Sequence, residues 1–248
     1  MKILKKLKLL YPIGYIAIKE SNLIKISIIL LSIIIIPTII LSWIFAFKYY
    51  KKNNNKYLPN WNYSLIIELI IWIFPIIIIL ILSYLTFVNT KILDPRNINI
   101  KKKILKINTI SLDWKWFFII CKYKIAIINE IVVPINKIIN FNITSLNNMN
   151  SFNIPSLSGQ IYSMPNMTTQ LNSFINKTSF LNGFSSNYSG EGFSDMNFNF
   201  YSLKKNDYFI WIKSIYFMNK ILNNKKYLLL LKKSFNNKIN YFNKIYIK

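Results

Sequence analysis

Two places in the sequence hold residues whose types could do chemistry. The stretch GFSSNYSGEGFSDM, residues 183–196, contains three of the chain's five glycines among serines and acidic residues. Glycine permits backbone conformations and close approaches that other residues do not, so this loop has the composition of a possible active-site loop. The second place is Glu68, the one acidic residue at the start of either long apolar run.

The residue types that are missing limit this chemistry. The chain has no histidine and a single cysteine, Cys121. It therefore cannot build a zinc site from cysteine and histidine, a histidine-based acid–base pair or an intramolecular disulfide. Thiolate or imidazole ligation of copper, zinc or iron is effectively excluded, because one thiol and a few thioethers are the soft ligands present. Cys121 lies between apolar runs, and we expect it to be an ordinary buried residue.

The net charge of the chain does not identify a partner. The 32 basic and 8 acidic residues give a formal net charge of +24, which would ordinarily suggest nucleic acid or an anionic membrane surface. Nearly all of the basic residues are lysines, and they are scattered through every segment. Since they form no basic helix, stripe or RNA-binding motif, we predict no nucleic-acid partner.

Two long apolar runs predict membrane-spanning helices. Residues 26–47 and residues 69–88 contain no charged side chain over 22 and 20 positions, and about 20 apolar residues cross the hydrocarbon layer. Pro37 and Pro75 lie inside the runs, where membrane helices tolerate proline. A set of aromatic residues lies nearer the ends of the runs than their centres, as interfacial aromatics do: Trp43, Trp61, Trp72 and Tyr84.

The connection between the two runs predicts an antiparallel hairpin. Residues 48–63 are few and polar, so the outer ends of both helices lie on one side of the membrane. Lysines occur both in this connection and on the outer flanks, so their distribution does not fix the orientation. The N-terminal residues 1–18 have a basic start but lack the continuous apolar core of a secretory signal, and we expect them to be retained.

Glu68 has two readings within this hairpin. A carboxylate inside a membrane segment is energetically expensive and is a functional hypothesis by default. Alternatively, an interfacial glutamate three residues inside an apolar segment could simply reach the lipid headgroups.

Short alternating patterns replace the apolar runs after residue 96. Ile139, Phe141 and Ile143 alternate with polar residues, and Phe198 and Phe200 follow Met196 in a second such run. A period of two with β-branched and aromatic residues predicts half-buried strands, so residues 105–201 should form a β sandwich or barrel. The spacing in residues 207–248 predicts one or two helices, which either pack on this domain or lie on the membrane surface.

Several motifs together resemble one protein family. They are KYLPNW at residues 56–61, IELIIWIFPIIII at 67–79, SLDWKWFF at 111–118, NEIVVP at 129–134, MNSFNIPSLSGQIYSMPNMTTQL at 149–171 and NYSGEGFSDMNF at 187–198. In order and spacing they resemble subunit II of the haem-copper respiratory oxidases, and within it the cytochrome bo-type ubiquinol oxidases. The resemblance covers most of residues 22–201. It implies a two-helix membrane hairpin (23–90) after an N-terminal segment (1–22), an outward cupredoxin-like β domain (91–203) and a C-terminal tail (204–248).

The resemblance also locates a copper-binding loop whose ligands have been replaced. In the branch that oxidises cytochrome c, subunit II binds two copper ions through two histidines, two cysteines, a methionine and a glutamate carbonyl. The corresponding positions here are Asn150 and Phe193 for the histidines, Ser185 and Ser189 for the cysteines, Asn187 for the glutamate and Met196 for the methionine. Only Met196 keeps its type, so the resemblance implies no metal, no cofactor and no catalytic residue in this subunit.

Electrons would then pass from a membrane quinol directly to subunit I, which would hold the haems and one copper. The expected partners are subunit I, subunits III and IV, the quinol pool and the bilayer of a bacterial inner membrane. In the family, a carboxylate at the place of Glu68 marks the entrance of a proton-uptake channel, and the loop near Asn54 would be cytoplasmic. The aromatic stretch from Trp114 to Phe118 corresponds to one that receives electrons from cytochrome c, but we favour simple packing in the β core.

Two alternatives remain open from the sequence. One is a cytochrome c oxidase subunit that has lost its copper site, and the other is a non-catalytic, membrane-tethered binding domain. For the loop itself, we predict that Gly183, Gly190 and Gly192 still shape the backbone. We expect Ser185, Ser189 and Phe193 to close the former site by hydrogen bonding and packing.

Overall fold

The computed structural model describes residues 12–50, 63–96 and 103–246. The chain forms two compact units. One comprises the residues up to Ser21 together with those from Leu93 onward, and the other comprises Asn22–Ile92. The KYLPNW motif, the loop near Asn54 and Trp61 lie outside the described residues.

Two helices account for the apolar runs. Helix α2 spans Tyr15–Lys48 and helix α3 spans Leu65–Ile92. Their mean hydropathies of 2.8 and 3.2 make both apolar and long enough to cross a membrane, which confirms the expected helices. Pro37 lies inside α2 without ending it, and nearby Thr38 and Ser42 donate hydroxyl hydrogen bonds to main-chain carbonyls one turn earlier.

Helix α2 begins before the apolar run, and its first residues, of which Ile16 and Ala17 are buried, belong to the same compact unit as the β domain. The backbone amides of Ile13 and Gly14 both donate to the carbonyl of Ser156, at 2.8 and 2.9 Å. Gly14 also forms an isolated antiparallel bridge with Ile175. A β-carbon at residue 14 would lie 1.8 Å from the carbonyl oxygen of Leu157, so only glycine fits there.

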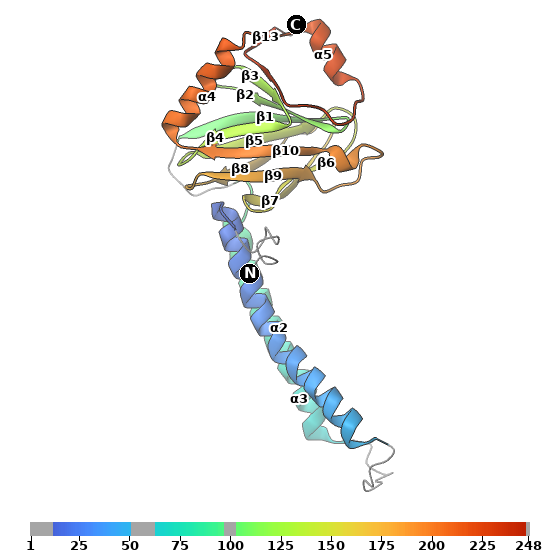
Figure 1. Cartoon of the computed structure of the whole chain (residues 1–248). Helices are drawn as coiled ribbons and strands as arrows, with labels where there is room; N and C mark the ends of the chain where they lie inside the picture. Colours follow the sequence, from blue (N-terminus) through green and yellow to red (C-terminus); the bar gives the residue numbers. More distant parts are fainter. Residues whose placement is uncertain (1–11, 51–62, 97–102, 247–248) are drawn as a thin grey trace. The chain divides into compact units, whose positions relative to one another are not determined.

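The predicted β domain is a sandwich of two mixed sheets (Figure 1). The six-stranded sheet has the order β12-β3-β2-β1-β5-β8, and the five-stranded sheet has the order β4-β10-β9-β6-β7. The strands that belong to these sheets up to residue 203 are β1 (Ile104–Leu112), β2 (Lys115–Ile120), β3 (Ile125–Ile128), β4 (Glu130–Pro134), β5 (Ile138–Ser145), β6 (Asn150–Ile154), β7 (Ser158–Ser163), β8 (Thr169–Phe174), β9 (Ser179–Ser185) and β10 (Asn197–Leu203).

The core of the domain contains side chains from both sheets. Trp116 and Phe118 of β2 contact Phe152 of β6 and Phe198 of β10 through aromatic rings 5.1–6.4 Å apart. In β5 the side chain of Phe141 is fully buried, as the alternating pattern predicted. The prediction that the aromatic stretch packs in the β core is therefore confirmed for Trp116 and Phe118.

The C-terminal residues belong to the same compact unit as the sandwich. Helix α4 (Lys205–Phe217) buries Tyr208, Ile212 and Ile215 against the core. A short helix, α5, and three short strands follow it, of which β12 extends the six-stranded sheet beside β3 and β11 pairs with β13: α5 (Asn224–Leu231), β11 (Ile221–Asn223), β12 (Asn240–Phe242) and β13 (Lys244–Tyr246). Two helices packed on the domain match one of the two expectations for this segment, whereas the strands were not expected.

The expectation for Cys121 was wrong. Its side chain is exposed, because β2 ends at Ile120 and the following turn carries residue 121 to the surface. The apolar neighbours that suggested burial lie in β2 and β3, on either side of that turn.

Candidate functional site in the loop between β9 and β10

Strands β9 and β10 position the glycine-rich loop. They pair antiparallel, with Phe184 opposite Asn197, so residues 185 and 196 lie at the same end of the sheet. The connection contains one short 3-10 helix, η2 (Phe193–Asp195), in which the Asp195 amide donates to the Gly192 carbonyl at 3.2 Å and the Met196 amide to the Phe193 carbonyl at 3.1 Å.

Each of the three glycines is required by geometry, as predicted. Gly190 has a φ of +105°, which side-chain-bearing residues rarely adopt. A β-carbon on Gly183 would lie 2.0 Å from the ring of Phe198, and one on Gly192 would lie 2.5 Å from the ring of Trp114. The backbone path of the loop therefore depends on glycine at all three positions.

Three of the six positions that the resemblance matches to copper ligands come together in one hydrogen-bond network. The Ser185 hydroxyl lies 3.4 Å from Oδ1 of Asn150 and 3.2 Å from the carbonyl oxygen of Asn187, and it accepts from the amide of Ser151 at 3.3 Å. Nδ2 of Asn150 in turn donates to the Ser111 hydroxyl at 3.3 Å. Ser185 and Asn150 are only 3% and 2% exposed, so neutral groups that satisfy one another occupy this place.

The other three positions are held separately. Met196 is buried, and its carbonyl accepts from the amide of Ser185 at 3.2 Å. The ring of Phe193 packs on Tyr188, with the ring centroids 5.7 Å apart. The hydroxyl of Ser189 is buried and makes no hydrogen bond to any described residue, so the expectation that it closes the site by hydrogen bonding was wrong. Its carbonyl is what bonds, accepting from the Trp114 indole at 3.1 Å.

The donor atoms at these positions do not fit a copper centre of the thiolate and imidazole type. Hydroxyl and amide oxygens do not replace bridging thiolates, and the phenyl ring of Phe193 offers no lone pair. The polar side-chain atoms of Ser185 and Asn150 already form hydrogen bonds with each other and with the backbone. The arrangement can stabilise a loop, but it offers no strong ligand and no acid–base pair.

Sequence reasoning did not predict which residues cover the outer side of the loop. Trp114, which has a φ of 62° in the turn between β1 and β2, stacks on Phe235 with the ring centroids 4.7 Å apart. Beside it, the buried Lys115 donates from Nζ to the Lys232 carbonyl at 2.9 Å and to the Ser234 hydroxyl at 2.5 Å. Burial lowers the pKa of Lys115, and the nearby charge of Asp113 partly opposes this.

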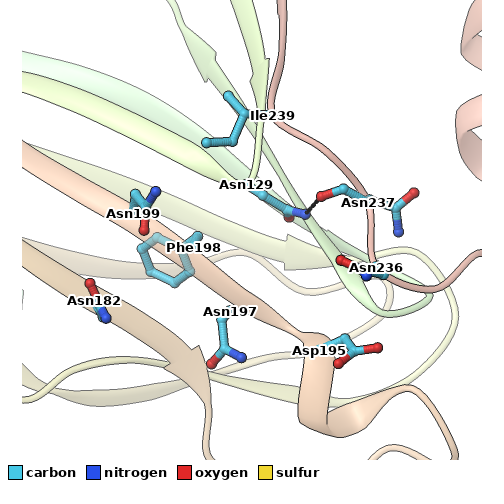
Figure 2. A pocket seen from close by; sticks show the side chains of 9 residues that line it. All are labelled: Asn129, Asn182, Asp195, Asn197, Phe198, Asn199, Asn236, Asn237 and Ile239. Atoms are coloured by element: carbon cyan, nitrogen blue, oxygen red, sulfur yellow. Dashed lines mark hydrogen bonds between the residues drawn. The ribbon is translucent and has the colours of Figure 1, made fainter.

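A polar cleft of about 300 Å³ lies next to this cover (Figure 2). Asn129 forms one wall and joins two elements: its Oδ1 accepts from the Trp116 amide at 2.8 Å, and its Nδ2 donates to the Asn237 carbonyl at 3.0 Å. Asparagine supplies most of the lining, which consists of Asn129, Asn182, Asp195, Asn197, Phe198, Asn199, Asn236, Asn237 and Ile239. Asp195 is the one ionisable group among these nine, so the cleft supplies no acid–base pair.

Glu68 is placed in the first turn of α3, and its side chain is exposed. Its backbone amide donates to the carbonyl of Ser64 at 3.0 Å. Among the described residues the carboxylate forms no salt bridge. Glu68 belongs to the compact unit Asn22–Ile92, whereas the loop between β9 and β10 belongs to the other unit.

Comparison with protein families identifies the β domain. Residues 105–203 match the family described as cytochrome c oxidase subunit II, periplasmic domain. Among solved structures, the periplasmic domain of subunit II of cytochrome oxidase of Bradyrhizobium japonicum aligns at 20% identity with a TM-score of 0.44. That alignment covers 47% of this chain and 96% of that chain.

Comparison with whole sequences is more specific. Cytochrome bo(3) ubiquinol oxidase subunit 2 of Buchnera aphidicola subsp. Schizaphis graminum is 45% identical over 82% of this chain and 71% of its own length. The protein of the same name from Pseudomonas putida is 40% identical over 93% of this chain and 74% of its own. Ubiquinol oxidase subunit 2 of Acetobacter aceti is 36% identical over 90% of this chain and 74% of its own length. The chain therefore belongs to the ubiquinol oxidase subunit 2 family.

Proposed function

We propose that this chain is the second subunit of a ubiquinol oxidase complex and carries no redox centre of its own. The observation that supports the second part is the network of Ser185, Asn150 and Asn187, which occupies the place of a metal site with neutral, mutually satisfied groups. Related chains bear the name ubiquinol oxidase subunit 2, which supports the first part.

The chain is a bacterial inner-membrane protein with its β domain on the periplasmic side. Two candidate membrane helices and a domain of the periplasmic family agree on this arrangement. With both helices crossing the membrane, the connection between them lies on the cytoplasmic side, and Glu68 lies near that end of α3.

In this proposal a membrane quinol gives its electrons directly to a haem-bearing subunit I, which also holds a copper ion. Subunits III and IV complete the complex. The present chain stabilises subunit I and covers it on the periplasmic side. The aromatic residues of β2 are assigned a packing role, because Trp116 and Phe118 contact Phe152 and Phe198 in the core.

Glu68 is proposed to collect protons at the entrance of an uptake channel. A carboxylate at the wet end of a membrane helix can take up and release protons without large rearrangement. In the purified complex, Glu68→Ala should slow turnover and proton uptake, whereas Glu68→Asp should preserve most of both. Undiminished proton uptake by Glu68→Ala would refute this role.

Purification through a tag on this chain tests the complex itself. We expect a haem-bearing subunit to co-purify from native membranes in a fixed ratio to the chain. A chain recovered without haem, from cells whose membranes contain an intact haem oxidase, would instead favour the membrane-tethered binding domain.

A further inference from the structure

A line of four aromatic side chains from outside the glycine-rich loop runs through the β domain. Tyr123 follows β2, Tyr208 and Trp211 belong to α4, and Tyr241 belongs to β12. The ring centroids are 6.0 Å apart from Tyr123 to Tyr208, 5.7 Å from Tyr208 to Trp211 and 6.5 Å from Trp211 to Tyr241. Tyrosine and tryptophan are the side chains most readily oxidised by one electron, and transfer between rings this close is fast.

Only one of the three tyrosines in this line has a proton acceptor. Tyr241 donates a hydrogen bond from its hydroxyl to Oε1 of Glu130. The hydroxyls of Tyr123 and Tyr208 are buried and have no hydrogen-bond partner among the described residues. A phenol that loses an electron becomes a strong acid, so its oxidation is favourable where a base within hydrogen-bond reach takes the proton.

Packing alone explains the ring contacts but does not explain the carboxylate. Glu130 is 7% exposed, and no described lysine or arginine forms a salt bridge with it. A buried carboxylate without a cation is costly. The Tyr241 hydroxyl is its hydrogen-bond partner, which places the acid against the one tyrosine of the line that it can deprotonate.

We propose that Tyr241 and Glu130 form a one-electron oxidation site that reduces high-potential radicals, such as peroxyl radicals, at the β domain. Tyr241 gives up one electron, its O–H bond breaks, and the proton forms a new O–H bond on the Glu130 carboxylate. The products are a neutral tyrosyl radical and a carboxylic acid. The peroxyl radical takes the electron and a proton from water and becomes a hydroperoxide, and the hydroxide ion that remains is neutralised when Glu130 returns its proton to the solvent. The other rings carry the electron outward when the radical arrives beside them. This proposal does not depend on the proposed function of the complex.

The test uses the full-length chain in detergent and a photogenerated ruthenium(III) tris-bipyridine oxidant at about pH 8, above the ordinary range of carboxyl pKa values. Samples frozen after the flash should show a persistent tyrosyl radical by electron paramagnetic resonance. Tyr241→Phe should abolish the persistent signal, whereas Tyr188→Phe, at a tyrosine that is 75% exposed, should leave it unchanged. Glu130→Gln keeps a hydrogen-bond acceptor but cannot take the proton, and it should lower the yield about tenfold or more.

A persistent signal of wild-type size in both Tyr241→Phe and Glu130→Gln would overturn the proposal. A second measurement guards against misfolded variants, because it needs only the wild-type chain. Proton transfer coupled to electron loss should slow radical formation in heavy water by about a factor of two or more. Equal rates in the two solvents would also overturn it.

Discussion

The Ser185 hydroxyl joins strand β6 to the first residues of the loop. It accepts from the amide of Ser151 at 3.3 Å, lies 3.2 Å from the Asn187 carbonyl, and is almost completely buried. A buried polar group that loses its partner costs more free energy than an exposed one, because water does not replace the lost bond. The hydroxyl should therefore contribute to the stability of the loop without any metal.

We expect Ser185→Ala to lower the free energy of unfolding of the β domain by about 1–3 kcal/mol, since it leaves the Ser151 amide unpaired. Chemical denaturation of the full-length chain in detergent measures this. Ser194→Ala, at an exposed serine of the same loop, is the matched control and should have little effect. Equal stability of Ser185→Ala and wild type would show that the network carries no stabilising bond.

Glycine is required at residue 183 because there is no space for a side chain. We expect Gly183→Ala to destabilise the domain by about 1–3 kcal/mol, because the new methyl group would overlap the ring of Phe198. Gly159→Ala is the control, since its β-carbon would approach only the flexible end of Glu20 at 3.0 Å. Thermal melting of the two variants should separate them, and identical melting would contradict the tight packing at residue 183.

Glu130 should make stability depend on pH. Burial raises the pKa of this carboxyl above its usual 4.5, although the Tyr241 hydrogen bond partly opposes the shift. The folded state therefore holds the proton more tightly than the unfolded state, and the contribution present at low pH is lost as pH rises through the folded pKa. We expect Glu130→Gln to lack this loss, so that its stability relative to wild type increases from pH 4 toward neutrality. A pH-independent difference would contradict the raised pKa.

At the scale of elements, the C-terminal segment completes the domain. Strand β12 pairs with β3, and Phe242 and Leu222 pack with Phe117 in a second apolar cluster on the outer side of the six-stranded sheet. Lys115 holds the segment between α5 and β12 through hydrogen bonds to the Lys232 carbonyl and the Ser234 hydroxyl.

Removing the lysine should loosen this segment. We expect Lys115→Met to increase amide hydrogen exchange in residues 232–238 and to lower stability by about 1–3 kcal/mol, because the two hydrogen bonds donated by the buried Lys115 are lost. Lys106→Met, at an exposed lysine on the neighbouring strand β1, is the control. Unchanged exchange in Lys115→Met would show that stacking of Phe235 on Trp114 is sufficient to hold the segment.

The elements that the sequence predicted are those whose burial repeats along the chain. The alternation around Phe141 and the apolar runs of α2 and α3 each reflect one environment maintained over many residues. In contrast, β11, β12 and β13 are three residues long, and their pairing is set by distant partners. The burial of Lys115 could not be predicted either, since it depends on the segment around Lys232, more than one hundred residues later in the chain.

At the scale of the whole molecule, the loop between β9 and β10 is held by the β domain itself. The glycines and the Ser185 network fix its backbone path through packing and hydrogen bonds among protein groups. The positions that correspond to copper ligands could be compared residue by residue from the sequence. The contacts of Ser189 and Phe193 could not be predicted in this way, because they are made with Trp114 and Tyr188.

The substrate of the purified complex tests the central claim most directly. Oxygen consumption should be measured with ubiquinol and, separately, with reduced cytochrome c as the electron donor, at equal enzyme concentration. The account predicts rapid oxygen uptake with ubiquinol and none above background with cytochrome c, because the donor set of this subunit does not fit a copper centre. Rapid oxidation of cytochrome c by the complex, together with copper bound stoichiometrically to this subunit, would contradict it.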